Sequence, residues 1–479
     1  MLVNFIPPEL EKILLETPEL GRAYLVGGAV RDALLGRPAG RDFDIEVFDV
    51  DYEQLVQSLA RWGRTDLVGR SFGVVKLNTG SDCQYDFTVP RQDSKVAPGH
   101  KGFKVELDPA ITLQEAAARR DFTINSILYD PRARQTLDFF GGGADLRNRV
   151  LRHTSAAFAE DPLRVLRGMQ FAARFNLTAD PETIEICRRM KGAFSELAVE
   201  RVREEWFKWA QSSTMPSAGL RFLVETEWVE HFPEIKSMVG VAQEPEWHPE
   251  GDVFIHTCHC CDALARLPQW QAGDTPSRIV HMLAVLAHDF GKPATTSQAV
   301  KDGRMRIVSP GHEEAGADLA TTFLGRIGAP QAVQERVVPL VRNHLFHWQS
   351  MTDRAVRRLA RRLEPENIQG LCLVMTADSM GRPPLPPVEP EHVRLLLARA
   401  QELQVRHKPP EPILMGRHLI ELGLEPGKMF GSILDKAYEA QLEGAISDLT
   451  QAWKWLAGEV GLELSATATE KLKRKMGND

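Results

Sequence analysis

Two aspartates, Asp42 and Asp44, stand two residues apart in the segment DFDIEVF, residues 42–48, where polar and apolar side chains alternate. This alternation predicts a half-buried strand with both carboxylates on the same face. Such carboxylates repel one another unless a cation neutralises them, and Mg²⁺ is commonly held by one or two carboxylates together with substrate phosphates. The pair therefore indicates a magnesium site suited to phosphoryl chemistry, although two acids on a solvated strand face would explain the spacing as well.

A glycine pair precedes these aspartates. The strand-like segment AYLVGG, residues 23–28, ends in Gly27 and Gly28, and a helical pattern begins at once with Arg31. Glycine lets the backbone approach a ligand closely, and the N–H groups at a helix N-terminus favour an anionic phosphate. A strand-to-helix turn often needs glycine for its geometry alone, so the pair gains weight only from the aspartates that follow it.

A second set of metal-ligating residue types lies in the later half of the chain. Its members are His256, His288, Asp289 and Asp378, with His312 and His344 as further candidates. Imidazole and carboxylate ligands suit Zn²⁺, Ni²⁺, Mn²⁺ or Fe²⁺. One helical histidine is usually a core or surface residue, but a set in the order H…HD…D is hard to explain that way. The pattern therefore predicts a second metal site, occupied by a transition metal.

Three of the six cysteines crowd into HTCHCC, residues 256–261. Their spacing fits no closed tetrahedral zinc site, so we expect Cys258 and Cys261 to fill helix-packing positions instead. A disulfide framework is not expected in a chain this long that lacks a secretion signal.

The elements that must position these residues change in type along the chain. Besides the two segments above, FGVVKLNT and CQYDFTVP, residues 72–79 and 83–90, indicate strands that neighbour one another. This is an α+β pattern, which predicts a small mixed or antiparallel sheet in an N-terminal head. After about Arg152 the periodicity becomes helical, as in residues 162–175, and we expect no further strand.

Length and charge limit the class of protein. The 479 residues suggest about three or four domains, and a net charge of −7 argues against a uniformly basic nucleic-acid coat without excluding RNA binding. The N-terminus lacks the features of a signal peptide, and the longest apolar run falls short of the roughly 20 residues that span a bilayer. We therefore expect a cytoplasmic protein without a membrane partner.

Several short motifs occur together in a fixed order along the chain. They are GGAVRD (27–32), DFD (42–44), RRDFTIN (119–125), GGADL (142–146), EDPLR (160–164) and ERVREE (200–205). In this order they resemble the class II tRNA nucleotidyltransferase and bacterial poly(A) polymerase family. The later histidines and aspartates resemble an HD phosphohydrolase domain, as in HD-bearing CCA-adding enzymes.

The resemblance implies a role for each matching residue. Asp42 and Asp44 would hold the catalytic Mg²⁺, and Gly27, Gly28 and Arg31 would cradle the triphosphate. The residues that would orient the sugar and phosphates, read the base or otherwise contact the nucleotide are Arg120, Asp121, Asn125, Asp161, Arg164 and Arg167. Asp86 is a possible third metal carboxylate, and the segment 91–104 resembles a loop that helps to switch specificity from C to A.

Asp161 and Arg164 also have a physical logic of their own. Residues three apart share one helix face, aspartate accepts hydrogen bonds, and arginine only donates them. Together they could match an edge of cytosine or adenine and leave groups of guanine and uracil unpaired. The alternative is an intrahelical ion pair of about 0.3–0.5 kcal/mol.

Each of two later features has two possible explanations, contact with RNA or a purely structural role. Arg354, Arg357, Arg358 and Arg361 share a helix face that could meet RNA or only solvent. Residues 413–446 predict two helices around the turn EPGK, where Lys428 could meet a backbone phosphate or the helices could simply pack as a hairpin.

Together these patterns predict four segments and one main activity. The segments are a nucleotidyltransferase head (1–150), a helical neck for base recognition (151–235), an HD domain (236–390) and a helical tRNA-binding tail (391–479). The activity is template-independent addition of CCA to the 3′ end of tRNA from CTP and ATP, with no DNA partner expected. A-only addition, CC-only addition, poly(A) tailing and an HD hydrolase with an RNA-holding head remain alternatives, as does activity of the HD site itself.

Overall fold

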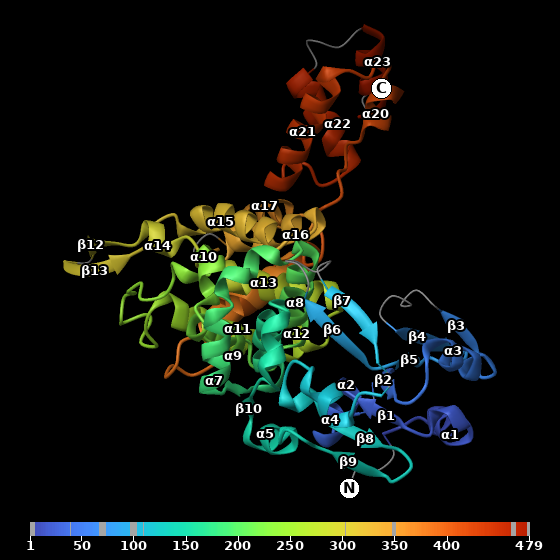
Figure 1. Ribbon diagram of the computed structural model, residues 1–479. Helices are drawn as coiled ribbons and strands as arrows, with labels where there is room; N and C mark the ends of the chain where they lie inside the picture. The colour runs from blue at the N-terminus through green and yellow to red at the C-terminus, as the bar shows by residue number, and fades with distance from the viewer. Residues whose placement is uncertain are drawn as a thin grey trace. The chain divides into compact units, whose positions relative to one another are not determined.

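The computed structural model describes residues 5–38, 40–66, 73–95, 103–108, 110–301, 303–346, 351–460 and 466–476. The chain forms two compact units, which we describe separately (Figure 1). Unit 1 comprises Met1–Lys236 with Arg326–Gly328, and unit 2 comprises Ser237–Gly325 with Ala329–Asp479.

A seven-stranded mixed sheet forms the base of unit 1, in the order β3-β4-β5-β2-β1-β8-β9. Its strands are β1 (Ala23–Val26), β2 (Asp42–Val47), β3 (Arg64–Asp66), β4 (Val74–Asn78), β5 (Gln84–Thr88), β8 (Leu128–Asp130) and β9 (Gln135–Leu137). Only β2 and β5 pair in parallel, and the other neighbours are antiparallel. The predicted α+β class and the four strands expected from sequence are confirmed.

Strand β2 shows why the sheet presents its acids on one face. Phe43, Ile45 and Val47 are buried on one side, whereas Asp42 and Asp44 point to the other. This is the alternation that the sequence predicts for a half-buried strand. Helix α2 (Gly28–Leu34) then begins directly after β1, beside these acids.

Helices complete unit 1 beyond the sheet. The principal ones are α6 (Leu163–Phe175), α8 (Val199–Ser212) and α9 (Pro216–Glu225), and α6 packs against both of the others. Gly168 permits the close approach, because a Cβ there would lie 2.7 Å from the ring of Phe222 and 3.1 Å from that of Phe122. Trp206, Trp209 and Trp228 are fully buried in this helical part.

Unit 2 is almost wholly helical. Its central helix α13 (Thr275–Ala287) packs against α11 (Val253–Arg266), α16 (Gln331–Asn343) and α18 (Ile368–Met380). Nearer the C-terminus, α20 (Gly416–Glu421), α21 (Lys428–Glu443), α22 (Leu449–Val460) and α23 (Ala466–Lys475) follow. These four helices have an apolar cluster of their own, which includes Leu419, Ile433 and Trp453.

The expectation of no strand after about Arg152 was wrong. Strands β12 (Ser297–Lys301) and β13 (Arg304–Val308) form an antiparallel hairpin in unit 2, and β10 (Val150–Leu151) pairs with β11 (Thr178–Ala179). Gly303 occupies the hairpin turn with φ +72°. The Asp-Gly pair at 302–303 is a common turn sequence of tight hairpins, but half of the flanking residues are polar, so neither flank has the apolar run of the strands predicted in unit 1.

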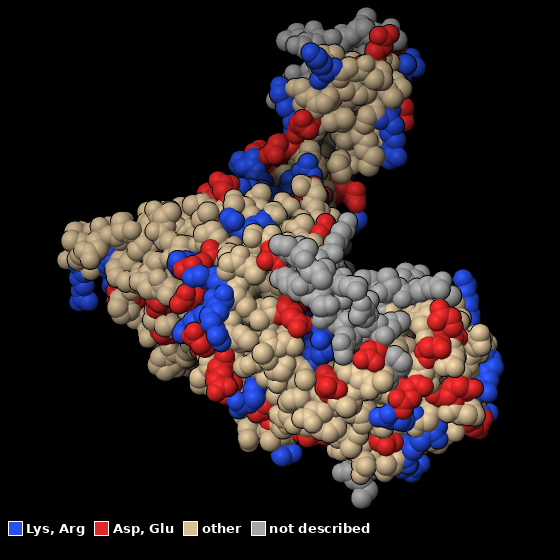
Figure 2. Space-filling view, viewed as in Figure 1, with Lys and Arg blue, Asp and Glu red and all other residues tan. Residues whose placement is uncertain are grey.

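The arginine row predicted on one helix face lies on α17 (Asp353–Leu363), and two of its members form ion pairs with α21. Arg354 and Arg358 lie 2.7 Å and 3.2 Å from Oε1 of Glu443 on α21, and Arg358 also pairs with Glu439 at 2.7 Å. The row therefore joins two helices of unit 2. On the face drawn in Figure 2, basic and acidic side chains are interspersed, as the net charge of −7 leads one to expect.

We predict that Gly168→Ala destabilises unit 1 by about 1–3 kcal/mol, because the added Cβ overpacks the contact with Phe222. Urea denaturation followed by tryptophan fluorescence reports this directly, since three buried tryptophans lie in the same helical part. Gly192→Ala is the matched control, because no atom lies within 4 Å of a Cβ at that position. Equal stability of the two variants would contradict the close packing of α6.

Candidate functional site

A cavity of about 740 Å³ in unit 1 contains the residues predicted for nucleotide addition. Its lining includes Gly27, Gly28, Arg31, Asp42, Asp44, Arg120, Asp121, Asn125, Asp161, Arg164 and Arg167. These residues come from the turn between β1 and α2, from α2 and β2, from the segment before β8, and from α6 with the turn before it. Motifs that are far apart in sequence thus meet in one place, with volume enough for a nucleotide.

The carboxylate of Asp44 lies in an environment that disfavours its negative charge. Burial raises the pKa of Asp44; Arg120 opposes this, while Asp86, Glu46 and Asp42 add to it. Asp86 lies directly opposite Asp44 in the β2–β5 register. A bound cation would relieve this repulsion, so the residues present fit a divalent metal.

The glycine turn allows the backbone to come close to these acids. Gly27 has φ +70°, and a Cβ there would lie 3.3 Å from Oδ2 of Asp44 and 3.4 Å from Nη1 of Arg120. Any larger residue would be strained and would crowd the carboxylate. Gly27 therefore serves the geometry of the turn and keeps the space beside Asp44 open.

A chain of hydrogen bonds fixes the next group of predicted residues. Arg31 Nη1 donates to Asn125 Oδ1 at 2.7 Å, and Asn125 Nδ2 donates to Asp121 Oδ1 at 3.0 Å. Arg167 Nε donates to Asp121 Oδ2 at 2.7 Å. Although burial disfavours its charge, Arg167 and the hydrogen bonds from Asn125 and the Phe122 N–H hold the pKa of Asp121 below its usual value. The network keeps two arginines aimed into the cavity.

Asp161 and Arg164 are held separately, and no ion pair joins them among the described residues. Arg201 of α8 donates to both Asp161 oxygens, with Nη1 at 3.4 Å and Nη2 at 2.8 Å. Arg164 donates to the carbonyls of Ala157 at 2.6 Å and Arg119 at 2.7 Å. The intrahelical pair considered from sequence does not form, and each side chain is anchored by an outside partner.

Sequence reasoning missed five polar residues of the cavity: Gln170, Arg174, Arg201, Glu205 and Lys208. Arg201 and Glu205 lie within the motif ERVREE, which was recognised but given no role. The helical spacing of 201, 205 and 208 was the available signal, since these positions share one face of α8.

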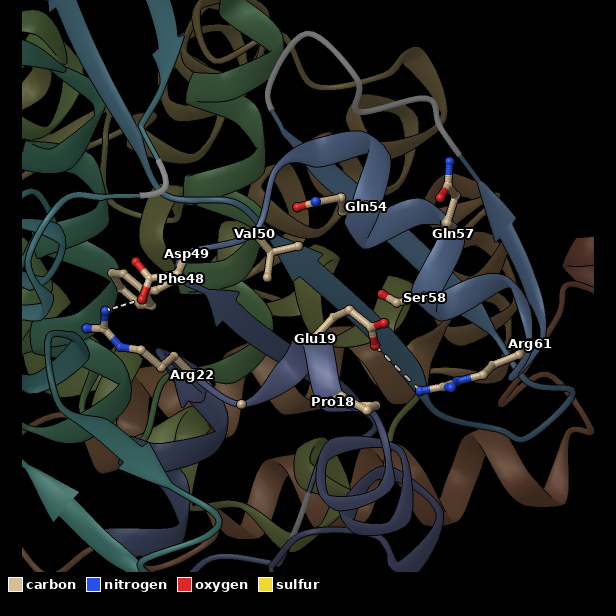
Figure 3. A pocket seen from close by; sticks show the side chains of 11 residues that line it. Pro18, Glu19, Arg22, Phe48, Asp49, Val50, Gln54, Gln57, Ser58 and Arg61 are labelled. Atoms are coloured by element: carbon tan, nitrogen blue, oxygen red, sulfur yellow. Dashed lines mark hydrogen bonds and ion pairs between the residues drawn. The ribbon is translucent and has the colours of Figure 1, made fainter.

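A different pocket of unit 1, of about 540 Å³, lies beside β1 and α3 (Tyr52–Ala60) and contains none of the predicted residues (Figure 3). Its charges are paired, Arg22 with Asp49 at 2.5 Å and Arg61 with Glu19 at 3.8 Å. It offers no convergent set of groups for chemistry.

In unit 2 the predicted histidines and aspartates come together in a buried cluster. His256 Nε2 lies 3.2 Å from Asp378 Oδ1 and 3.6 Å from Asp289 Oδ2. His288 Nε2 lies 3.2 Å from Asp289 Oδ2. On the other side of Asp289, its Oδ1 lies 3.4 Å from His312 Nε2, which in turn lies 3.2 Å from His344 Nε2. All six predicted residues of this cluster are buried.

Hydrogen bonds outside the cluster fix the orientation of each ring. Nδ1 of His288, His312 and His344 lies 2.7 Å from a backbone carbonyl oxygen in each case, of Val285, Ser309 and Val341 respectively. Nδ1 of His256 lies 2.7 Å from Oε1 of Glu250. Each Nδ1 therefore donates a hydrogen bond away from the cluster, which turns each Nε2 toward its centre, as in metal-binding histidines.

The cluster fits a cation on these grounds. The Nε2 atoms of His312 and His344 face each other although both are acceptors, and His288 Nε2 has no hydrogen-bond partner. Burial opposes the charges of Asp289 and Asp378. Nevertheless, His288 and Lys292 hold the pKa of Asp289 well below its normal value, and Arg382 does the same for the pKa of Asp378. These acids therefore remain ionised and able to bind metal.

A cavity of about 530 Å³ opens onto this cluster. Lys292, Lys301 and Arg382 line it together with Asp289 and Asp378, so an anionic group could enter beside the centre. Sequence reasoning missed Lys292, Arg382 and Glu250, because neither a lysine after a helix end nor a loop glutamate signals a ligand-orienting role on its own. It also set Cys260 aside, although that residue lies one helical turn after His256.

No helix in the described part of the chain is long and apolar enough to cross a membrane.

Residues 23–152 match the poly A polymerase head domain, and residues 256–382 match the HD domain. Both families use divalent metal ions, in agreement with the two clusters of candidate ligands.

Solved structures with a similar fold include the Bacillus stearothermophilus CCA-adding enzyme in complex with CTP, at 20% identity and a TM-score of 0.62 over 96% of this chain and all of that one. The Thermotoga maritima CCA-adding enzyme in complex with tRNA has 18% identity and a TM-score of 0.58, over 96% of this chain and 97% of that one. At these identities the likeness concerns the fold.

Curated relatives are closer in sequence. The multifunctional CCA protein of Xanthomonas campestris is 36% identical over 402 residues, which cover 80% of this chain and 92% of the relative. That of Xylella fastidiosa is 36% identical over 374 residues, covering 75% and 84%. The chain therefore belongs to the multifunctional CCA protein family, within the class II tRNA nucleotidyltransferases and bacterial poly(A) polymerases.

Proposed function

We propose that the chain adds CCA to the 3′ end of tRNA from CTP and ATP, at the cavity of unit 1. The observation that carries this proposal is the convergence of all eleven predicted nucleotide-site residues on that cavity. The relatives' name and the CTP, ATP and tRNA complexes of similarly folded enzymes support it.

Asp42 and Asp44 are proposed to hold Mg²⁺, which would neutralise charge on the triphosphate and activate the attacking 3′-hydroxyl. Gly27, Gly28 and the N-terminus of α2 receive the phosphates through backbone N–H groups. Arg31 adds positive charge at the same place and is kept there by Asn125. These groups position the triphosphate for in-line attack and departure of pyrophosphate.

Asp161 and Arg164 are proposed to read the base. Asp161 is restrained by Arg201, and Arg164 is restrained by two carbonyls, so neither side chain needs to reorganise when a nucleotide enters. A fixed acceptor next to a fixed donor suits cytosine and adenine, and it leaves a buried group unpaired with uracil or guanine. The segment 91–104 could tune this choice; its residues 96–102 lie outside the described part of the chain.

A second activity is proposed for unit 2, because a cavity whose lining includes Lys292, Lys301 and Arg382 opens onto its buried ligand cluster. A transition metal (Ni²⁺, Mn²⁺, Fe²⁺ or Zn²⁺) held by His256, His288, Asp289 and Asp378, with His312 and His344, would polarise a phosphate and activate water. Lys292 and Arg382 would attract the phosphate. The substrate class is an RNA end carrying a 2′-phosphate or a 2′,3′-cyclic phosphate.

The four-part division stays a proposal as well: a head at 1–150, a neck at 151–235, an HD domain at 236–390 and a tRNA-binding tail at 391–479. We further propose that the protein acts in the cytoplasm.

Two variants should separate the activities. Asp42→Ala is expected to lower nucleotide addition by roughly 100-fold or more, because it removes a charge-stabilising group, and to leave phosphohydrolase activity unchanged. His288→Ala is expected to do the reverse. Radiolabelled CTP incorporation into tRNA and hydrolysis of a 2′,3′-cyclic phosphate on an oligoribonucleotide measure the two. Nucleotide addition by Asp42→Ala at the wild-type rate would refute the metal assignment in unit 1.

Arg201 should act as a positioning residue for Asp161. Removing a hydrogen bond to a charged group costs about 1.5–3 kcal/mol, so Arg201→Gln should lower kcat/KM for CTP and ATP roughly 10- to 100-fold. It should also raise the use of UTP relative to CTP, which a merely structural defect would not do.

Arg203→Gln on the same helix is the control, because Arg203 does not line the cavity. Arg201→Lys should restore discrimination only in part, since an ammonium cannot reproduce the two-point contact. An unchanged ratio of CTP to UTP use in Arg201→Gln would show that Arg201 plays no part in base selection.

A further inference from the structure

Cys260 lies inside the ligand cluster of unit 2. It follows His256 by one turn of α11, is fully buried, and places Sγ 3.3 Å from His256 Nε2. One ligand atom each from His256, Cys260, His288 and Asp378 lies within 4.8 Å of all the others. The cysteine therefore shares its surroundings with three residues already predicted to bind metal.

The separations match those of atoms bound to one metal. Zinc–sulfur and zinc–nitrogen bonds of about 2.3 Å and 2.1 Å, at angles between roughly 90° and 109°, put the two donor atoms roughly 3.1–3.6 Å apart. The 3.3 Å between Cys260 Sγ and His256 Nε2 lies in this range, as does the 3.2 Å between His256 Nε2 and Asp378 Oδ1.

An independent observation points to a missing partner at the same place. His288 is 1% exposed. Its Nε2, which belongs to the same group of atoms as the sulfur, makes no hydrogen bond, although Asp289 Oδ2 lies 3.2 Å away. An unpaired buried nitrogen is costly unless a ligand or ion satisfies it. A metal between His288, His256 and Cys260 would do so.

The backbone at the end of α18 packs closely against the Cys260 sulfur. A Cβ at Gly381, just past the end of α18, would lie 2.4 Å from Cys260 Sγ and 2.8 Å from its N atom. Sγ also lies 3.7 Å from the Asp378 carbonyl oxygen, one turn before that glycine. The sulfur is thus lodged beside the segment that supplies the Asp378 ligand.

Neighbouring cysteines serve as a comparison. Cys258 and Cys261 are as buried as Cys260, yet neither belongs to a candidate metal group within the described ranges. Burial alone therefore does not account for the position of Cys260, whereas the predicted helix-packing role suits the other two.

We propose that Cys260 is a direct thiolate ligand of the metal in unit 2, beside His256, His288 and Asp378. On binding, the thiol proton leaves to solvent and the sulfur donates an electron pair to the cation. A thiolate favours borderline-soft divalent ions such as Zn²⁺, Co²⁺ and Fe²⁺ over Mg²⁺ and Mn²⁺. This inference rests on the metal centre of the proposed function and narrows the choice of its metal.

Cobalt substitution tests the proposal in the full-length protein. The metal-free chain is titrated with Co²⁺ while absorption is recorded, because cobalt gives visible bands with any ligand and a near-ultraviolet charge-transfer band only with thiolate. The wild type and Cys261→Ala should both show the charge-transfer band. Cys260→Ala and the nearly isosteric Cys260→Ser should lose this band. Both should also bind Zn²⁺ more weakly by roughly 10- to 100-fold or more, since the loss of a residue that only hydrogen-bonds a metal ligand already lowers affinity by that factor.

Circular dichroism and urea unfolding of each metal-free variant, compared with the metal-free wild type, verify that unit 2 is folded. If cobalt binds with visible bands but the wild type shows no charge-transfer band, or if Cys260→Ser retains it, the thiolate ligand is refuted while the metal centre stands. If no cobalt binds to the wild type at all, both the ligand and the metal centre are refuted.

Discussion

Repulsion between carboxylates on β2 and β5 is the constraint on which unit 1 depends. Strand alternation puts Asp42 and Asp44 on one face, and the parallel register brings Asp86 opposite Asp44. Burial raises the pKa of Asp44 further above its usual value. A sheet so arranged is fully relieved only when cations arrive, and the glycine turn beside it supplies N–H groups for the phosphates that come with them.

Unit 2 also brings ionisable groups together in a buried place, but its candidate metal ligands differ from those of unit 1. Lys292 and Arg382 counter the charges of its acids, and backbone carbonyls and Glu250 orient its histidines so that their Nε2 atoms face a buried centre. The candidate ligands of the two sites differ: those of unit 1 are carboxylate oxygens, whereas those of unit 2 include imidazole nitrogens as well as carboxylates.

Sequence predicted the parts of this structure that depend on local pattern or on ordered motifs. The alternation in 42–48 gave the strand and the face of its aspartates, and the motif series named all eleven residues that meet in one cavity. What it missed depends on contacts between distant segments. Arg201 contacts Asp161 only when α8 packs on α6. Cys260 shows no special environment in the sequence, and the fold of unit 2 places it beside Asp378 and His288. The β12–β13 hairpin forms between two short segments in which half of the residues are polar.

The most direct test of the central claim is a gel assay with tRNA that lacks its CCA end, Mg²⁺, and CTP, ATP or both. If the carboxylate site of unit 1 adds CCA, both nucleotides will be needed for three added residues, and CTP alone will give a stop after two. No addition under any condition would contradict the claim. A two-residue stop with both nucleotides, addition of A only to tRNA ending in CC, or long A tails would contradict CCA addition and assign the site to CC-adding, A-adding or poly(A) activity.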